Sequence, residues 1–267
     1  MSRSQNEPRD RKAEHIELAL DRRMQLEHSF FTPYRFVHDA LPEISWDEID
    51  LSCEFLGRRL SAPLLISCMT GGTEGATRIN DNLAKAAERC RVALGRGSQR
   101  KALEDPETAE TFRVRELAPS VPLLGNLGAV QLNYGYGPEE CRRAVEMIDA
   151  DALVFHLNPL QEAIQPEGDR DFSALLPRMA EVVEALEVPV VAKEIGCGLS
   201  DKVGRSLVRI GIEWLDTAGV GGTSWARIEA ARADDLDLGE VFADWGIPTP
   251  ESILCLLYTS PSPRDHG

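Results

Sequence analysis

The chain has 267 residues, of which 43% are hydrophobic and 27% are charged. This is enough apolar material for one large domain of the size of an α/β barrel, or for two small domains. Acidic residues outnumber basic ones by 44 to 29, and the formal net charge of −15 argues against nucleic acid as a partner, because phosphate neutralisation needs a positive surface. A small anionic ligand is still compatible with this charge, since it needs only a local basic pocket.

Targeting signals and cysteine motifs are missing from the sequence. No apolar run approaches the length of about 20 residues that spans a bilayer, so we expect no membrane partner. The N-terminus, MSRSQNEPRDRKAEH, is charged and lacks an apolar core, which predicts a cytoplasmic protein rather than a secreted one. None of the six cysteines forms a C-x-x-C pair, which favours reduced thiols over zinc or disulfides.

The N-terminal part of the chain predicts a helix and a hairpin. RKAEHIELAL, at 11–20, is typical of a helix start. Apolar residues alternate from Ile49 to Phe55 within 46–63, which indicates a β-hairpin. We expect this region, residues 1–60, to plug the N-terminal end of a barrel.

Downstream of this region, short apolar runs alternate with helical patterns. Strand–helix alternation is the signature of a parallel sheet. The number of units favours a (β/α)8 barrel, although a doubly wound sheet shows the same alternation. Ser200 and Asp171 are the expected N-caps of two of the helices. Strands are predicted at 62–67, 91–95, 121–126, 151–156, 188–194 and 212–216, and helices at 77–90, 137–148, 172–186 and 200–211.

The predicted barrel is incomplete. Only about six β/α units can be counted between residues 61 and 254, and a closed barrel needs eight. The remaining segment, 255–267, reads as a linker rich in proline and serine. We therefore expect that the natural chain is interrupted near residue 254 and ends in unrelated sequence.

Hydrogen-bonding side chains follow the fourth predicted strand, in HLNPLQE. Alternation along a strand places His156 and Asn158 on one face, pointing into the mouth of the barrel, and Gln161 and Glu162 would hang over it. These groups either satisfy one another or bind a ligand. Buried polar groups need partners that apolar neighbours cannot supply, so four of them at one strand end favour a ligand.

Other strand ends carry a lysine and glycine-rich turns. Lys193 ends an apolar strand just before Gly196 and Gly198, and it either reaches solvent or faces a ligand. A fixed ammonium beside an electron-accepting ring would stabilise the ring's anionic reduced form. The turns in SCMTGGTEG and AGVGGTSW are either tight βα connections or sites for a phosphate or a ring edge. The polar side chains beside these turns and in GNLG are Thr70, Thr217, Thr223 and Asn126.

Two basic clusters suit a diphosphate, because arginine forks and lysines match its oxygens. The first, in DRKAEH, is Arg11, Lys12 and His15, and a solvated charge run is the competing interpretation. The second, in GRGSQR, is Ser98, Gln99 and Arg100. Glu162 is a candidate Mg²⁺ ligand, since one carboxylate with ligand phosphates and water suffices for that ion.

Taken in order, RKAEH, CMTGG, GRGSQR, GNLG, HLNPLQE, KEIGCG and GVGGTSW resemble type 2 isopentenyl-diphosphate isomerase, the FMN-dependent family, over roughly residues 8–254. The resemblance implies a (β/α)8 barrel with FMN at its C-terminal mouth. It also implies an enzyme of isoprenoid biosynthesis that interconverts isopentenyl and dimethylallyl diphosphate. The reaction is redox-neutral but needs reduced FMN, which NADPH typically supplies, and Mg²⁺. Members tend to form homo-oligomers.

The resemblance also implies roles for individual residues. Those matching the diphosphate substrate site are Arg11, Lys12, His15, Ser98, Gln99, Arg100, His156, Asn158 and Gln161. Those matching FMN contacts are Cys68, Met69, Thr70, Ser98, Asn126, Lys193, Thr217 and Thr223. Gln161, His156 and Lys193 are the implied catalytic residues, and Glu162 is the implied Mg²⁺ ligand.

Some positions depart from the family pattern. Thr217 stands where serine is expected, and Cys68 stands where alanine is usual. The flavin phosphate site of the family follows strands seven and eight, which this sequence does not supply. We therefore expect the chain to bind FMN poorly and to be largely inactive. The alternatives are another FMN-dependent barrel oxidoreductase, such as a 2-hydroxy-acid oxidase, or an inactive truncated fragment.

Overall fold

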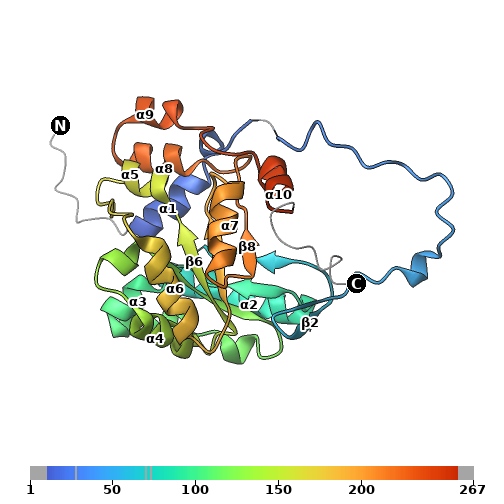
Figure 1. Cartoon of the computed structure of the whole chain (residues 1–267), viewed down its shortest axis with the longest axis horizontal. Coiled ribbons are helices and arrows are strands. Elements are labelled where there is room, and N and C mark those ends of the chain that lie inside the picture. The colour runs from blue at the N-terminus through green and yellow to red at the C-terminus, as the bar shows by residue number, and fades with distance from the viewer. Residues whose placement is uncertain (1–10, 28, 70, 73, 258–267) are drawn as a thin grey trace.

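The computed structural model describes residues 11–27, 29–69, 71–72 and 74–257. Their centre is a parallel six-stranded sheet in which the strand order follows the chain (Figure 1). Each strand pairs with the next one, as in a β/α barrel; a doubly wound sheet reverses its order at a switch point. The prediction of an incomplete barrel is confirmed. The strands are β3 (Leu65–Ile66), β4 (Ala93–Gly95), β5 (Leu123–Gly128), β6 (Ala152–Leu157), β7 (Val190–Glu194) and β8 (Trp214–Asp216).

Helices cover the outer face of the sheet. The four helices predicted between strands are present, and the third of them begins three residues later than expected. Outward side chains of the central strands, such as Leu153, Phe155 and Ala192, pack with Met179 and Leu207 in one buried cluster. The outer helices are α2 (Glu74–Cys90), α3 (Arg100–Glu104), α4 (Pro138–Ile148), α6 (Leu175–Ala185) and α7 (Asp201–Arg209).

One of the two predicted N-caps is correct. The Ser200 hydroxyl accepts a hydrogen bond from the Val203 amide and caps α7. The prediction for Asp171 is wrong. Its carboxylate accepts from the amide and hydroxyl of Ser173 and closes a local turn, so α6 starts only after Ala174.

The inner face of the sheet is apolar and meets an N-terminal hairpin. The hairpin joins β1 (Cys53–Phe55) to β2 (Arg58–Leu60), antiparallel, and is shorter than the predicted 46–63. Phe55 and Leu56 pack against the inward side chains Leu124, Val154 and Val191. The hairpin therefore supplies apolar cover to the inside of the sheet.

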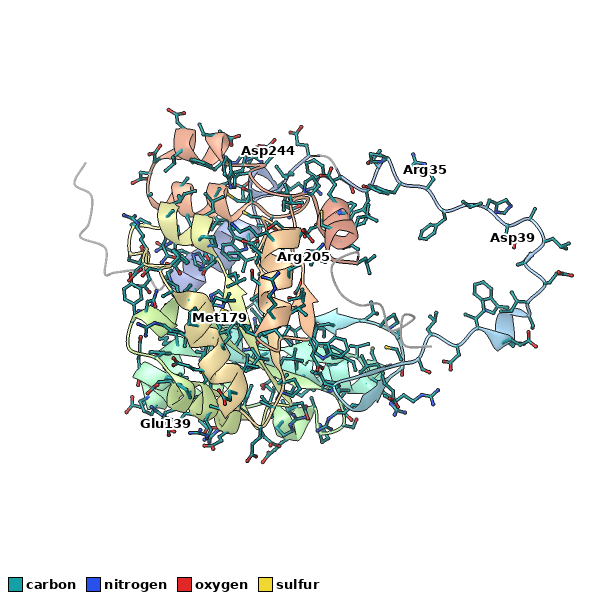
Figure 2. The ribbon with its side chains drawn as sticks, in the orientation of Figure 1. Arg35, Asp39, Glu139, Met179, Arg205 and Asp244 are labelled. Carbon is teal, nitrogen blue, oxygen red and sulfur yellow. The ribbon has the colours of Figure 1, made fainter. Side chains whose placement is uncertain are left out.

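The segment between η1 (Arg22–Met24) and the hairpin projects from the body as an arm (Figures 1 and 2). Its one described helical element is η2 (Trp46–Glu48). Phe36 and Val37 have exposed fractions of 104% and 96%, so nearly all of their surface faces solvent. Other exposed apolar side chains here include Phe31, Tyr34, Leu41, Ile44, Trp46, Ile49 and Leu51. Such an apolar surface favours association with other protein surfaces.

Additional helices lie over the carboxyl ends of the strands, at the upper end of Figure 1, and the last helix lies beside α7. The N-terminal helix α1, predicted at 11–20, spans Arg11–Ala19, and the others were not predicted. Leu256 in the last helix is buried, so the first residues of the predicted tail belong to a packed helix; 258–267 lie outside the described residues. The remaining helices are α5 (Pro159–Ile164), α8 (Trp225–Arg232), α9 (Leu236–Val241) and α10 (Thr249–Leu257).

Arg96 is a fully buried arginine with few partners. Its Nη2 donates to the Thr111 carbonyl at 3.0 Å, while Nε and Nη1 have no hydrogen-bond partner in the described part of the chain. Burial lowers the pKa of Arg96 to about 10, so it stays charged at neutral pH. A buried charge with incomplete hydrogen bonding destabilises the fold.

Replacing Arg96 by methionine is expected to raise the free energy of unfolding by about 1 kcal/mol, because the buried charge disappears and most of the volume is kept. The Thr111 carbonyl keeps a donor, the Asn80 amide at 3.3 Å. Urea unfolding would show a higher midpoint with an unchanged slope. A lower midpoint would mean that the guanidinium stabilises the core.

Candidate active site

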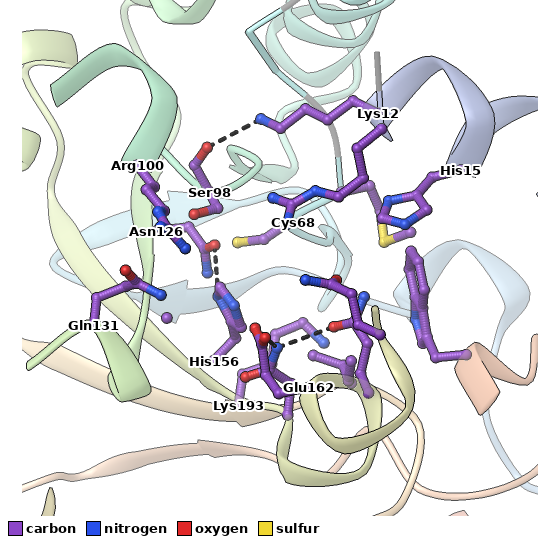
Figure 3. A pocket seen from close by; sticks show the side chains of 18 residues that line it. Lys12, His15, Cys68, Ser98, Arg100, Asn126, Gln131, His156, Glu162 and Lys193 are labelled. Atoms are coloured by element: carbon purple, nitrogen blue, oxygen red, sulfur yellow. Dashed lines mark hydrogen bonds between the residues drawn. The ribbon is translucent and has the colours of Figure 1, made fainter. Parts of the chain in front are cut away.

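A pocket lies between α1 and the carboxyl ends of the strands (Figure 3). Strand pairing brings its inner side chains together, because His156 on β6 is in register with Lys193 on β7 and with Gly128 on β5. Ser98 and Arg100 follow β4, and α1 closes the pocket from the other side. The predicted site residues that line it are Arg11, Lys12, His15, Cys68, Met69, Ser98, Arg100, Asn126, His156, Asn158, Gln161, Glu162 and Lys193.

His156 is a neutral imidazole of defined tautomer. Its Nδ1 lies 3.0 Å from the Asn126 Oδ1, and because that oxygen only accepts, Nδ1 carries the proton (Figure 3). Nε2 keeps its lone pair on the side of Gly128. Burial, followed by the charges of Lys193 and Arg11, lowers the pKa of His156 to about 3. At neutral pH this histidine acts as a hydrogen-bonding group and carries no charge.

The low pKa of His156 predicts a loss of stability in acid. Between pH 6.5 and 3 the unfolded chain protonates this side chain and the folded chain does not, so stability rises with pH in that window. The contribution is at most about 1.4 kcal/mol per pH unit. Urea unfolding at several pH values should show a shallower acid slope for His156→Asn than for the wild type. Equal slopes would contradict the assignment of a neutral buried histidine.

Gln161 is fixed at both ends of its amide. Its Oε1 accepts from Asn158 Nδ2 at 3.0 Å, and its Nε2 donates to Glu229 Oε1 at 2.8 Å. Asn158 Nδ2 also donates to Glu162 Oε1 at 2.9 Å. The polar side chains of HLNPLQE therefore do satisfy one another in part. Asn158 Oδ1 is buried and has no hydrogen-bond partner among the described residues, so this network retains an acceptor for a ligand.

Glu229 on α8 is the centre of this network and was missed by the sequence analysis. It is completely buried, and its Oε1 lies 2.9 Å from His15 Nε2 while its Oε2 accepts from Arg232 Nη1 at 2.7 Å. Burial would raise its pKa, but the hydrogen bonds from His15, Arg232 and Gln161 lower it below its ordinary value. An ionised carboxylate therefore joins α1, α5 and α8. WARIEAAR gives no sign of this, since only tertiary packing buries the residue.

Lys193 places a cation at the floor of the pocket. Its Nζ donates to the Glu194 carbonyl at 2.6 Å and lies 3.7 Å from Asp216 Oδ2. The Glu194 carboxylate in turn accepts from the backbone amides of Ile195, Gly196 and Gly198, and from that of Cys197. This nest of amides fixes the loop after β7 and thereby the carbonyl that holds Lys193.

Basic side chains gather at the outer rim. Lys12 Nζ donates to the Ser98 carbonyl at 3.2 Å, which ties α1 to the loop after β4 (Figure 3). Arg11, Lys12, Ser98 and Arg100 also line an adjoining outer pocket together with Lys101. The basic end of the site therefore faces outward, where Glu104 and Glu167 also line the outer pocket, and His156 and Lys193 lie at the inner end.

Of the predicted residues that the structure describes, three do not line this pocket. Gln99 is completely buried. Its Nε2 donates to the Ala144 carbonyl at 2.8 Å and its Oε1 accepts from the Asn126 backbone amide at 3.0 Å, so it connects β5 and α4. Thr217 lines a cavity along the inner face of the sheet, and Thr223 lines a separate small pocket beside α8. Thr70 lies outside the described residues.

Several pocket residues have no equivalent among the predictions. Trp225 stands edge-on to His15, with ring centroids 5.2 Å apart. Gln165 reaches Arg11 Nη1 at 3.1 Å and Glu229 Oε1 at 3.3 Å when its amide is oriented to satisfy both. A tryptophan directly after GVGGTS was a usable signal; the glutamine was not. The others in this group are Gly128, Gln131 and Ile195.

Known proteins resemble this chain over most of its length. No family model matches it. Over 248 residues it is 55% identical to the isopentenyl-diphosphate delta-isomerase of a Synechococcus species, covering 91% of this chain and 71% of the relative. Over 257 residues it is 50% identical to the enzyme of that name from Rickettsia akari, covering 95% of this chain and 75% of the relative. The chain belongs to the isopentenyl-diphosphate delta-isomerase family.

Solved structures similar to this member of the isomerase family are more distant. A mandelate oxidase superposes with a TM-score of 0.41 at 16% identity, over 86% of this chain and 67% of that one. A flavocytochrome b2 variant with sulfite bound gives a TM-score of 0.47 at 13% identity, over 93% of this chain and 65% of that one. At these TM-scores neither likeness bears on the chemistry of the chain.

The pocket of this isomerase-family chain fits Mg²⁺ only in part. Among the described residues there is no cluster of three or more His, Cys, Asp or Glu side chains that could hold a metal alone. Glu162 with the free Asn158 Oδ1 offers two oxygen ligands, and Mg²⁺ typically completes such a set with ligand phosphates and water. The donor set therefore fits a metal that arrives with a diphosphate.

Proposed function

We propose that the pocket binds isopentenyl and dimethylallyl diphosphate and that this chain, once it is saturated with FMN, catalyses their interconversion. The observation that supports it best is the assembly of one pocket from a basic rim and an inner end that holds neutral His156 beside Lys193, in a chain that is 55% identical to a named isomerase. The diphosphate would lie against Arg11, Lys12 and Arg100. The hydrocarbon would point inward toward His156 and Gln161.

In this proposal the rim supplies binding energy that orients the reacting carbons. Arginine and lysine hold the diphosphate at a point remote from the double bond, and this fixed end converts binding into alignment. Gln161 presents an amide whose orientation is set by Asn158 and Glu229. Neutral His156 adds a hydrogen-bond acceptor without bringing a positive charge close to the developing cation.

Reduced FMN would supply the electron-rich, proton-exchanging partner of the reaction when bound. Asn126 and Lys193 fit the polar edge of its ring, and Cys68 and Met69 fit its surroundings. A cation at Lys193 offsets the negative charge of a reduced ring.

We also propose Glu162 as the Mg²⁺ ligand, NADPH as the reductant, assembly as a homo-oligomer and a cytoplasmic location. In the described residues no helix is long and apolar enough to cross a bilayer.

Flavin binding by this chain is expected to be weak. Among the described residues, the cavities beside β8 and α8 are lined by no arginine and, of the lysines, only by Lys193, so the flavin phosphate finds few cationic partners there. Titrating FMN and following its fluorescence would compare this chain with the Synechococcus relative. Equal affinity of the two proteins would contradict this expectation.

The direct test of the function is an isomerase assay at saturating FMN. The chain would be incubated with FMN, dithionite, Mg²⁺ and isopentenyl diphosphate in D₂O, and the products followed by proton NMR. Formation of dimethylallyl diphosphate with deuterium incorporated supports the proposal. A chain that binds FMN and substrate but forms no product, while the Synechococcus relative does so under the same conditions, would refute it.

A further inference from the structure

The loop between α5 and α6, residues 165–173, is packed against the active-site helix α5. Gly168 sets the closeness of this contact, because a Cβ on it would lie 1.9 Å from the Glu162 carbonyl oxygen. Arg170 continues the contact by donating from Nε to the Glu162 carbonyl at 3.4 Å. The backbone of the loop therefore has a defined position beside the pocket.

Asp169, the next residue in this loop, touches both polar ends of the proposed substrate site. Its Oδ2 accepts from Arg100 Nη1 at 2.6 Å and from Gln131 Nε2 at 2.9 Å. Its backbone amide donates to Glu162 Oε2 at 2.8 Å. The side chain is 15% exposed, so these contacts are largely shielded from water.

We infer that Asp169 is a positioning residue that sets the separation between Arg100 and Glu162, and that it thereby couples diphosphate binding to Mg²⁺ binding. The inference rests on the proposed function, in which Arg100 binds the diphosphate and Glu162 the metal. A metal that bridges a carboxylate and a diphosphate tolerates little change in the distance between the two protein groups.

The hydrogen bonds leave the required groups free. Arg100 gives Nε to Glu104 at 2.8 Å and one Nη1 proton to Asp169, so three of its five N–H groups stay available to an anion. Each carboxylate oxygen of Glu162 accepts one hydrogen bond, from Asn158 or from the Asp169 amide, and each keeps a lone pair for a metal. Asp169 therefore orients both groups without blocking either.

Positioning and simple electrostatics predict opposite results for the loss of this carboxylate. A negative charge near an anion site repels the ligand, so on charge alone Asp169→Ala would tighten diphosphate binding. If Asp169 positions the site, Asp169→Ala weakens binding, and the benefit that Mg²⁺ gives to the binding shrinks. Loss of an outer partner of a metal ligand typically costs about 10- to 100-fold in metal affinity.

The experiment is calorimetric titration of inorganic pyrophosphate into the full chain, with and without Mg²⁺. For Asp169→Ala we expect about tenfold weaker binding in the presence of Mg²⁺ and a smaller ratio between the two conditions, with Asp169→Asn intermediate. Asp171→Asn removes a carboxylate from the same loop without touching Arg100, and it should behave as wild type. Glu104→Gln should weaken binding equally in both conditions, because Glu104 contacts Arg100 and not Glu162.

The outcomes separate the inference from the function on which it rests. Wild-type affinity, or tighter binding, in both Asp169 variants overturns the inference alone. A wild-type chain that binds no pyrophosphate overturns the proposed function and the inference with it. Circular dichroism and urea unfolding identify a misfolded variant, in which case the conservative Asp169→Asn carries the comparison.

Discussion

Replacing Glu229 by alanine is expected to lower the free energy of unfolding by about 3 kcal/mol and kcat by about 100-fold. The stability loss lies at the low end for a broken buried ion pair, because Arg232 keeps Glu14 and Glu167 as partners. Gln161 and His15 lose the one acceptor that joins them. The kinetic loss follows from the Gln161 amide, which is then free to rotate away from its position in the pocket.

Urea unfolding and steady-state kinetics check this prediction separately. Glu229→Gln keeps the shape and one acceptor, so it should lose less stability than alanine while still lowering kcat. Glu240→Ala is the matched control on the next helix, since Glu240 also pairs with an arginine, Arg227, but is 65% exposed and should cost less than about 1 kcal/mol. Equal changes in stability and kcat for the Glu229 and Glu240 variants would show that Glu229 has no particular role in the site.

Replacing Lys193 by methionine is expected to reduce kcat/KM by about 100- to 1000-fold, the usual loss when one preorganised electrostatic group is removed. Methionine fills nearly the same volume, so stability should change little. Without the ammonium, Asp216 has no ion-pair partner at Lys193, but its side chain is 34% exposed and water can solvate it. The reduced flavin would then lack the cation that offsets its charge.

Two measurements besides activity test the Lys193 prediction. FMN fluorescence titration should show weaker binding of the flavin, and its reduction potential should become more negative, because the anionic reduced form is no longer stabilised. Lys202→Met, an exposed substitution on α7, is the control and should change neither quantity. An unchanged potential in Lys193→Met would place the ammonium away from the ring.

Much of the site could be predicted because parallel strands end together. His156, Asn158 and Lys193 are each identified by polar chemistry directly after an apolar run, and the topology then collects them at one edge. The same reasoning does not place Thr217 and Thr223 at this pocket. A glycine-rich turn carries no information on which side of the loop its threonine faces, and both side chains line other cavities.

The sequence by itself determined the number and order of the strands, the strand-end residues and the basic rim, because these depend on periodicity and on local motifs. The tertiary structure decided which polar groups form hydrogen bonds within the protein and which face the pocket. Gln99, adjacent in sequence to Ser98 and Arg100, is consumed by the core, whereas Glu229 and Asp169 come from unremarkable segments to hold the pocket together. The physical reason is that contacts between segments distant in the chain set the burial and the hydrogen-bond partners of a side chain. The local sequence around a residue does not reveal these contacts.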